Sequence, residues 1–241
     1  MATGTLTQAL SYTSIAVVAA LVGGAVAVYR APGPQMESNV QHFAAGVVFA
    51  AVAAELLPDI HDQSPVVVVV GFAAGVVAML GIHRLSKAVE KRGIGGEFAG
   101  AAGLIITVAI DMLIDGVLIG VTFIEEPATG VIVAVALAIE ILFLGVAAVV
   151  ALPDGMGGLR KMAVPAMFGA VLTLGVVVGV LTLEGAAETT IAVVLSFGAA
   201  ALLYLVTEEL LVKANKVPQT PTSTTLFFVG FLAIFLLDIV G

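Results

Sequence analysis

The chain has 241 residues, of which 61% are hydrophobic and 11% are charged, and its net charge is −8. A soluble domain of this length cannot bury so much apolar surface, so the composition excludes an ordinary soluble protein and indicates a polytopic membrane protein in contact with a lipid bilayer. The acidic balance argues against nucleic-acid binding, and the absence of cysteine excludes disulfides and thiolate metal ligands.

Eight apolar segments are long enough to cross a bilayer as helices. In chain order they are predicted at about 7–29, 38–58, 65–85, 98–124, 127–152, 163–183, 188–212 and 224–240. The residues before the first segment include no Lys or Arg, so they lack the basic region of a signal peptide and we expect this helix to be retained. No linker is long enough to indicate a second domain, so we expect residues 1–241 to form one all-α integral membrane domain.

The distribution of basic residues predicts the orientation of these helices. All nine lie in or beside the first, third, fifth and seventh loops: Arg30, Arg84, Lys87, Lys91, Arg92, Arg160, Lys161, Lys213 and Lys216. The alternate loops carry acids instead: Asp59, Asp62, Glu125, Glu126, Glu184 and Glu188. The positive-inside rule therefore places the basic loops in the cytoplasm and both termini outside, for a multi-pass protein of the plasma membrane.

Two of the predicted helices resemble each other when the sequence is shifted by 154 residues. Phe43 then falls on Phe197, and the run Glu55-Leu-Leu falls on Glu209-Leu-Leu. The second and seventh helices run in opposite directions, so the pattern predicts an inverted repeat that relates helices 1–3 to helices 6–8, as in many secondary transporters. Glu55 is expected near the outer face and Glu209 near the inner face, either as gates of a pathway or as solvated acids at helix ends.

Three carboxylates are predicted near the middle of the fourth and fifth helices: Asp111, Asp115 and Glu140. A charge at this depth costs at least ~2.5–3.5 kcal/mol, so it normally faces a polar pathway or a partner. Asp111 and Asp115 are four residues apart and share one helix face. Gly116 and Gly120 follow them as a stripe of small residues for close helix packing. With no Lys, Arg or His expected at the same depth, the acids predict a cation site; hydrogen-bonded structural acids that burial keeps protonated are the alternative.

Other polar residues give weaker indications of a pathway. The turn that contains Asp59, His61 and Asp62 is expected outside, either as a cluster that collects cations or as an ordinary acidic surface turn. Glu208 neighbours Glu209 but points about 100° away around a helix, which favours a solvated position.

The motifs around these acids resemble those of the ZIP (zinc/iron-regulated-transporter-like) family. The second helix ends Glu55-Leu-Leu-Pro58-Asp59, and the seventh reads Leu203-Tyr-Leu-Val-Thr-Glu-Glu-Leu-Leu211. The family's paired metal motifs look like His-Asn-x-Pro-Glu-Gly in helix 4 and a related His- or Gln-led version in helix 5. Here they read Asp111-Met112-Leu-Ile-Asp115-Gly116 and Glu140-Ile-Leu-Phe-Leu144-Gly145.

By this resemblance Asp111 stands at the position of the family's first histidine. Met112 stands at the position of its asparagine, and Asp115 at the position of its glutamate. Leu144 has lost the second carboxylate of the helix 5 motif, so we expect at most one ion site. The resemblance implies transport of divalent metal cations (Zn, Mn or Fe(II)) towards the cytoplasm, by a moving bundle against a scaffold, and it implies a homodimer.

The ligand types qualify the choice of ion. Carboxylate oxygens suit magnesium, calcium and manganese, whereas imidazole suits zinc, copper and iron; zinc also accepts carboxylates. No permanently bound cofactor is expected. The lost ligands leave open a proton or monovalent-cation pathway, or a metal sensor that does not transport.

An enzyme is not expected. Asp111 and Asp115 share one helix, whereas an intramembrane aspartyl protease needs facing aspartates from two helices. The sequence has no P-loop, so it does not support ATP-driven pumping by this chain alone.

Overall fold

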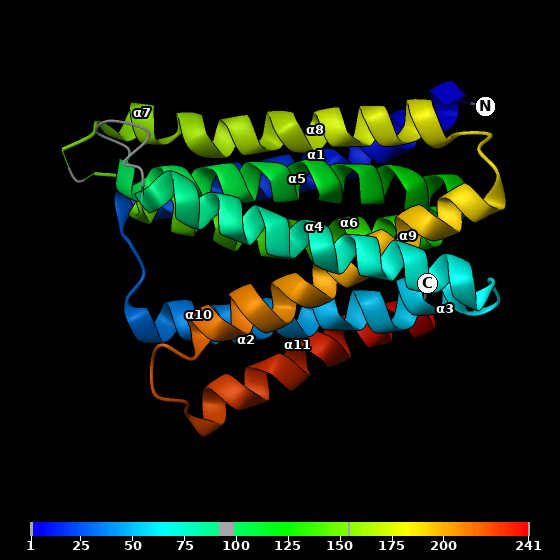
Figure 1. Ribbon diagram of the computed structural model, residues 1–241. Coiled ribbons are helices and arrows are strands. Elements are labelled where there is room, and N and C mark those ends of the chain that lie inside the picture. Colours follow the sequence, from blue (N-terminus) through cyan, green and yellow to red (C-terminus); the bar gives the residue numbers. More distant parts are fainter. Residues whose placement is uncertain (1, 92–98, 154, 241) are drawn as a thin grey trace.

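The computed structural model describes residues 2–91, 99–153 and 155–240, and within these ranges the regular structure is entirely helical (Figure 1). Eight of the helical stretches are long and apolar enough to cross a membrane, which confirms the predicted number. The elements are α1 (Ala2–Tyr29), α2 (Pro34–Ala51), a π-helical turn (Val52–Leu56), α3 (Leu57–His61), α4 (Pro65–Lys91), α5 (Ala99–Glu125), α6 (Pro127–Val150), α7 (Gly158–Lys161), α8 (Ala163–Leu183), α9 (Glu188–Tyr204), a second π-helical turn (Leu205–Leu210), α10 (Leu211–Ala214) and α11 (Pro221–Val240).

Most of the helices extend beyond the apolar runs that predicted them. α1 begins at Ala2 instead of residue 7, and α4 ends at Lys91 instead of residue 85. In the first turns of α1 the hydroxyls of Thr7 and Ser11 donate to backbone carbonyls one turn earlier. Because these hydroxyls have hydrogen-bond partners on the helix itself, polar residues can form its first turns. Arg92 and the expected helix start at residue 98 lie outside the described residues.

Proline marks the start of four of these helices. Pro34, Pro65, Pro127 and Pro221 are the first residues of α2, α4, α6 and α11. A helix leaves its first N–H groups without internal partners, and the ring of proline fixes φ near the helical value, so the residue is well suited to this position. The chain therefore turns between antiparallel helices at points that the sequence determines locally.

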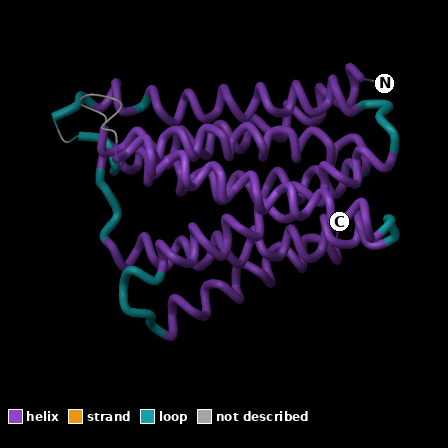
Figure 2. The backbone as a smooth tube through the Cα atoms, in the orientation of Figure 1, coloured by secondary structure: helices purple, strands orange, loops and turns teal. Residues whose placement is uncertain are grey.

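The long helices lie side by side along the bundle (Figure 2). α1 packs against α6 and α8, and α5 packs against α8 and α6; α2 packs against α11, and α4 against α9. We call the end where α1 and α10 end and α5 begins the basic end, and the opposite end, where α3 and α5 end, the acidic end. α1 begins and α11 ends at the acidic end (Figure 1).

Close crossing of α5 and α8 depends on two glycines. A Cβ at Gly116 would collide with the backbone carbonyl of Leu172, and a Cβ at Gly175 would collide with that of Leu113. Gly120 also lies against the backbone of α8, beside Val176 and Val180. The predicted role of the small residues after Asp115 in helix packing is thus confirmed, and α5 is held firmly against α8 beside the acids.

The two π-helical turns lie at corresponding places in the sequence. Val52–Leu56 and Leu205–Leu210 each interrupt a long helix at a glutamate, Glu55 in the first and Glu209 in the second, 154 residues apart. The helices that carry these turns also pack in related ways. Gly230 of α11 lies against the carbonyl of Phe43, and Gly75 of α4 lies against the carbonyl of Phe197, which again is 154 residues further on. π-Helical turns occur frequently at functional sites.

Candidate metal centre

Three acidic side chains from two helices converge inside the bundle. Asp111 and Asp115 lie near the middle of α5, and Glu140 near the middle of the adjacent α6. One oxygen from each carboxyl group lies within 4.8 Å of the others. Their exposed fractions are 5%, 1% and 0%. The structure thus brings together the three residues that the sequence singled out; we call them the acid triad.

The acid triad lacks hydrogen-bond partners in the described part of the chain. Both carboxyl oxygens of Asp115 and both of Glu140 are buried without a donor. No Lys, Arg or His in these ranges forms an ion pair with a member of the triad. An unpaired buried carboxylate is unfavourable, because neither solvent nor protein compensates for its lost hydration. The geometry therefore favours a bound cation or proton among the three groups.

The spacing of the oxygens suits a single ion. The three oxygens lie within 4.8 Å of one another, and ion–oxygen distances of about 2.0–2.6 Å, as for Mg²⁺ and Ca²⁺, need separations of at most about 3.5–4.5 Å. At the 4.8 Å limit, only a small approach of the side chains would let all three oxygens contact one ion. Three carboxylates leave further coordination positions for water or for second oxygens of the same groups. The set contains no nitrogen or sulfur donor, so its chemistry would suit a hard or borderline divalent cation.

The residues around the triad are apolar. Met112 is fully buried and Leu144 is 4% exposed, and both belong to the main apolar core of the bundle. Leu144 lies four residues after Glu140, as Asp115 lies four residues after Asp111, so the second carboxylate of α5 has an apolar counterpart on α6. This asymmetry limits the centre to three acidic side chains.

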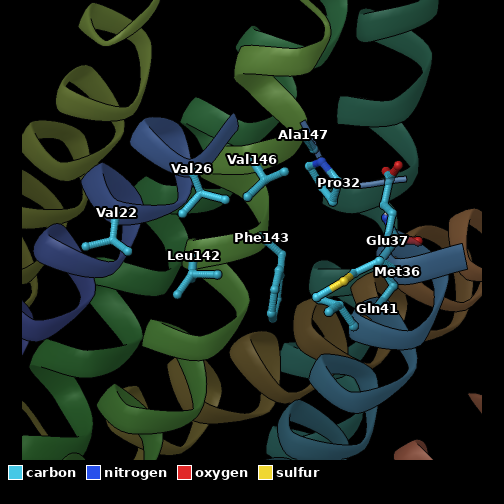
Figure 3. Close-up of a pocket in the computed structure, with 11 residues that line it drawn as sticks. Val22, Val26, Pro32, Met36, Glu37, Gln41, Leu142, Phe143, Val146 and Ala147 are labelled. Carbon is cyan, nitrogen blue, oxygen red and sulfur yellow. The ribbon is translucent and has the colours of Figure 1, made fainter. Parts of the chain in front are cut away.

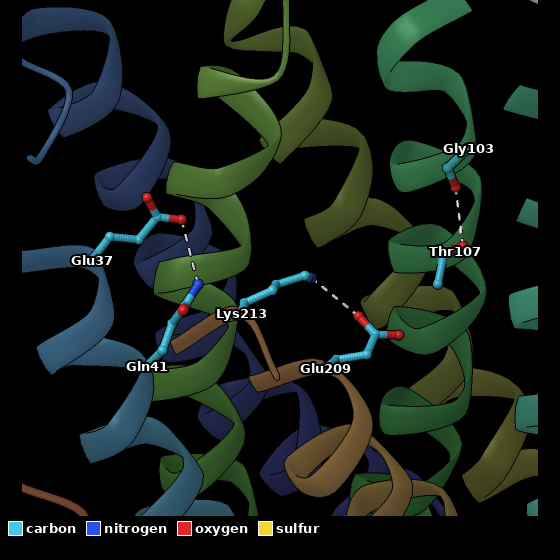
Figure 4. Close-up of polar contacts among 6 residues, drawn as sticks. All are labelled: Glu37, Gln41, Gly103, Thr107, Glu209 and Lys213. Atoms are coloured by element: carbon cyan, nitrogen blue, oxygen red, sulfur yellow. Dashed lines mark hydrogen bonds and ion pairs between the residues drawn. The ribbon is translucent and has the colours of Figure 1, made fainter. Parts of the chain in front are cut away.

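A charged pair lies on the basic-end side of the triad. Lys213 Nζ of α10 lies 3.2 Å from Glu209 Oε2, and the two side chains are 27% and 13% exposed (Figure 4). The sequence placed Lys213 only as a cytoplasmic topology determinant, and its pairing with Glu209 was missed. The spacing of four residues from Glu209 is the signal that indicates their pairing.

A cavity of about 340 Å³ opens at the basic end. Its lining includes Glu37, Ser38 and Gln41 of α2 and Lys213 of α10. Gln41 donates a hydrogen bond to Glu37 across one helical turn, at 3.4 Å (Figure 4). We call this the basic-end cavity; its lining mixes these polar side chains with apolar ones such as Leu104 and Val150.

The acidic end contains a different group of side chains. Glu55 is 5% exposed, and its Oε1 is buried without a hydrogen-bond partner. The side chains of Thr129 and Asp238 lie beside it, from α6 and α11. Asp59 is half-buried with one unpartnered oxygen, and the charges of Glu125 and Glu126 act on it. Thr129 and Asp238 were missed because only the packing of distant helices brings them to Glu55.

The other candidates from the sequence lie at the surface. His61 and Asp62 are exposed and line a shallow cavity of about 390 Å³ with Pro58, so of the three candidates in this turn only Asp59 is partly buried. Glu208 is exposed, as expected, whereas the neighbouring Glu209 is directed to Lys213. The structure does not bring His61, Asp62 or Glu208 to the acid triad.

An apolar cavity of about 150 Å³ lies among α1, α2 and α6 (Figure 3). Its lining is almost entirely apolar, with side chains such as Val22, Leu142 and Phe143, and Glu37 and Gln41 are its polar members. None of the three triad residues lines it. Its chemistry suits a hydrocarbon group and not a metal ion.

Neither a scan against protein-family models nor a search of curated proteins found a match for this chain. Its function must therefore be inferred from the acid triad and from the helices that hold it.

Proposed function

We propose that this protein carries divalent metal cations across a membrane through a site formed by Asp111, Asp115 and Glu140. The observation that supports this function most strongly is the convergence of three buried carboxylates from α5 and α6, four of whose oxygens lack a partner. Carboxyl groups in such surroundings in a membrane protein are typical of ion and proton pathways. A transported ion, bound transiently, would be their missing partner.

The charge of the centre favours a divalent over a monovalent ion. Three ionised carboxylates carry three negative charges in an apolar environment, and a divalent cation compensates for two of them. The Coulomb attraction between the carboxylates and an ion grows with the charge of the ion, and a low-dielectric interior screens this attraction only weakly. All-oxygen ligation places manganese, ferrous iron and zinc among the candidate ions.

The placement in the membrane follows from the helices and from the basic residues. The eight apolar helices would cross the plasma membrane, with the basic end in the cytoplasm and both termini outside, according to the positive-inside rule. The acid triad, near the middle of α5 and α6, would then lie near the middle of the bilayer. The Glu55 region would face the outside and the basic-end cavity the cytoplasm.

An inverted repeat that relates helices 1–3 to helices 6–8 is part of this proposal. Three features support it: the two π-helical turns at glutamates 154 residues apart, the matching glycine contacts of Phe43 and Phe197, and the contact pattern of the helices. The packing of α1 on α6 corresponds to that of α8 on α5, and the packing of α2 on α11 corresponds to that of α9 on α4. Inverted repeats place substrate sites near the bilayer midplane, where the triad would lie.

The motif resemblance to ZIP transporters agrees with this function. It implies movement of the ion towards the cytoplasm, and it implies a homodimer. The proposal of metal transport depends on the acid triad and not on the resemblance.

A proton or monovalent-cation pathway, or a metal sensor that does not transport, is the second candidate. The buried Leu144 favours it, because an apolar side chain occupies the place where a further carboxylate would complete a stronger metal site. Transport measurements separate the two candidates.

The experiment is metal uptake into proteoliposomes, with Zn, Mn, Fe(II), Co and Cd in parallel, for the wild type and for Asp111→Ala/Asp115→Ala. We expect uptake of at least one metal by the wild type and its loss in the variant. Absence of uptake of every metal by correctly folded wild type would contradict metal transport and favour the second candidate.

A further inference from the structure

The basic-end side of the acid triad holds a lysine in a fixed position. Lys213 lies one helical turn after Glu209, and its ammonium group is 3.2 Å from the carboxylate. Among residues 2–91, 99–153 and 155–240 this is the only ion pair between side chains. Glu209 is 13% exposed, so the pair is sheltered from solvent and its charges are screened less than those of a surface pair.

Lys213 lies beside the basic-end cavity, which is on the basic-end side of the triad. It lines that cavity together with Leu104 of α5 and Ala147 of α6. These two residues are each seven positions from Asp111 and Glu140 respectively, in the direction of the basic end, which corresponds to about 10 Å along a helix. An ion that moved from the triad to this cavity would therefore enter a space that Lys213 lines.

Charges interact over separations of this order in a low-dielectric interior, so we expect the positive charge of Lys213 and the opposite charge of Glu209 to influence Asp111 and Glu140. A fixed positive charge repels any cation that binds between the carboxylates, and the repulsion is proportional to the charge of that cation. The paired glutamate opposes this effect, so the two side chains influence ion binding with opposite signs.

We propose that Lys213 is a tethered counter-cation that sets the affinity of the acid triad and allows a bound divalent cation to leave towards the basic-end cavity. This inference rests on the proposed function of the triad. Three carboxylates without a basic neighbour would hold a divalent ion strongly, whereas conduction requires binding that is weak enough for release. Glu209 positions the ammonium group, and Lys213 lowers the affinity.

The test is equilibrium binding of Mn²⁺ to the full-length protein in detergent, measured by the electron paramagnetic resonance signal of the free ion. Lys213→Met removes the positive charge, and we expect Mn²⁺ to bind about tenfold more tightly. Glu209→Gln leaves the lysine unopposed, and we expect binding to weaken by about the same factor. The double variant should lie within about threefold of the wild type, because the two effects oppose each other.

Two further variants control for charge and for folding. Lys213→Arg keeps the positive charge and should bind Mn²⁺ within about twofold of the wild type. Lys87→Met removes an exposed lysine from the basic end of α4, and should also remain within about twofold because solvent screens its charge. If Lys213→Met does not fold, Glu209→Gln and the double variant decide the question.

The outcomes distinguish this inference from the proposed function. If the wild type binds Mn²⁺ and Asp115→Asn does not, but Lys213→Met binds no more tightly than the wild type, the triad is a metal site and the role of Lys213 is wrong. If the wild type binds no Mn²⁺ at all, both proposals are overturned. Tighter binding in Lys213→Met with weaker binding in Glu209→Gln supports the tethered cation.

Discussion

The two ends of this bundle carry similar helices and opposite charges. Each has a π-helical turn with a glutamate, Glu55 at the acidic end and Glu209 at the basic end. Four residues later the chain has Asp59 in the first case and Lys213 in the second, again 154 residues apart. Glu55 therefore lies in an acidic region, whereas Glu209 is neutralised by an ion pair.

This difference gives the proposed pathway a direction. The acids at the Glu55 end would attract cations from that side, and the lysine at the other end would oppose tight binding in the centre. Helix packing is related at both ends, so a few side chains suffice to make the ends unequal. In the proposed transporter, related helices would form the path and single charges would make its two ends different.

The comparison of the two ends depends on an ion site at the acid triad between them. Asp115→Asn removes one carboxylate of the acid triad and keeps the size of the side chain. We expect Mn²⁺ uptake to fall by about 100-fold or more, which is beyond the usual effect of changing a residue that only hydrogen-bonds to a ligand. Thr122→Val is the control on the same helix, because the Thr122 hydroxyl donates only to backbone carbonyls of α5. Equal uptake in Asp115→Asn and Thr122→Val would contradict the site.

Acidification should weaken metal binding at the centre. A bound metal requires ionised carboxylates, so metal and protons compete for the triad, and the affinity decreases as the pH is lowered. For each proton that the metal displaces from the triad, we expect the apparent Kd of Mn²⁺ to rise up to about tenfold for every unit by which the pH is lowered. Titrations of the wild type between about pH 8 and about pH 5 measure this slope, which should be shallower in any residual binding by Asp111→Asn/Asp115→Asn, because that variant keeps only the Glu140 carboxylate. An affinity that does not change with pH would exclude carboxylate ligation.

Giving the acidic end a lysine should make the two ends alike. Asp59→Lys places a positive charge where the basic end has Lys213, and we expect Mn²⁺ uptake into intact cells to fall by about tenfold. Asp62→Lys makes the same charge change at an exposed position of the same turn. Uptake should fall clearly less in Asp62→Lys than in Asp59→Lys, at equal expression of the two variants, and an equal fall in both would contradict a specific role of Asp59.

Neutralising the acidic-end glutamate should have the smallest effect. Glu55→Gln keeps the contacts with Thr129 and Asp238 but removes one negative charge, and we expect uptake to decrease by about threefold. Glu188→Gln, an exposed acid at the same end, provides the comparison. Uptake by Glu55→Gln that matches this control would remove Glu55 from the pathway.

Much of the fold could be predicted because its determinants are local. Apolar runs and loop prolines such as Pro65 and Pro127 give the number of helices and their turns. The triad could also be predicted in part, because a spacing of four residues places Asp111 and Asp115 on one helix face, and Glu140 lies at similar depth in the next helix. Convergence of the three groups on one point depends on the packing of α5 against α6.

Other features depend on contacts between distant segments. Asp238 lies beside Glu55 only because α11 packs against α2, and the sequence separation of these residues gives no indication of this. The pairing of Lys213 with Glu209 was missed because the depth of Lys213 in the membrane was judged from its place near a helix end. Its long side chain extends back along the helix to the partly buried Glu209. The π-helical turns also escaped prediction, because no local sequence signal for them was recognised.

The most direct test of the central claim is the stoichiometry of Mn²⁺ bound to purified protein at about pH 8, where carboxylates are ionised in the presence of metal. The acid triad predicts about one ion per chain for the wild type and almost none for Asp111→Asn/Asp115→Asn, which leaves a single carboxylate. Equal binding by the two folded proteins would contradict a metal site at the triad.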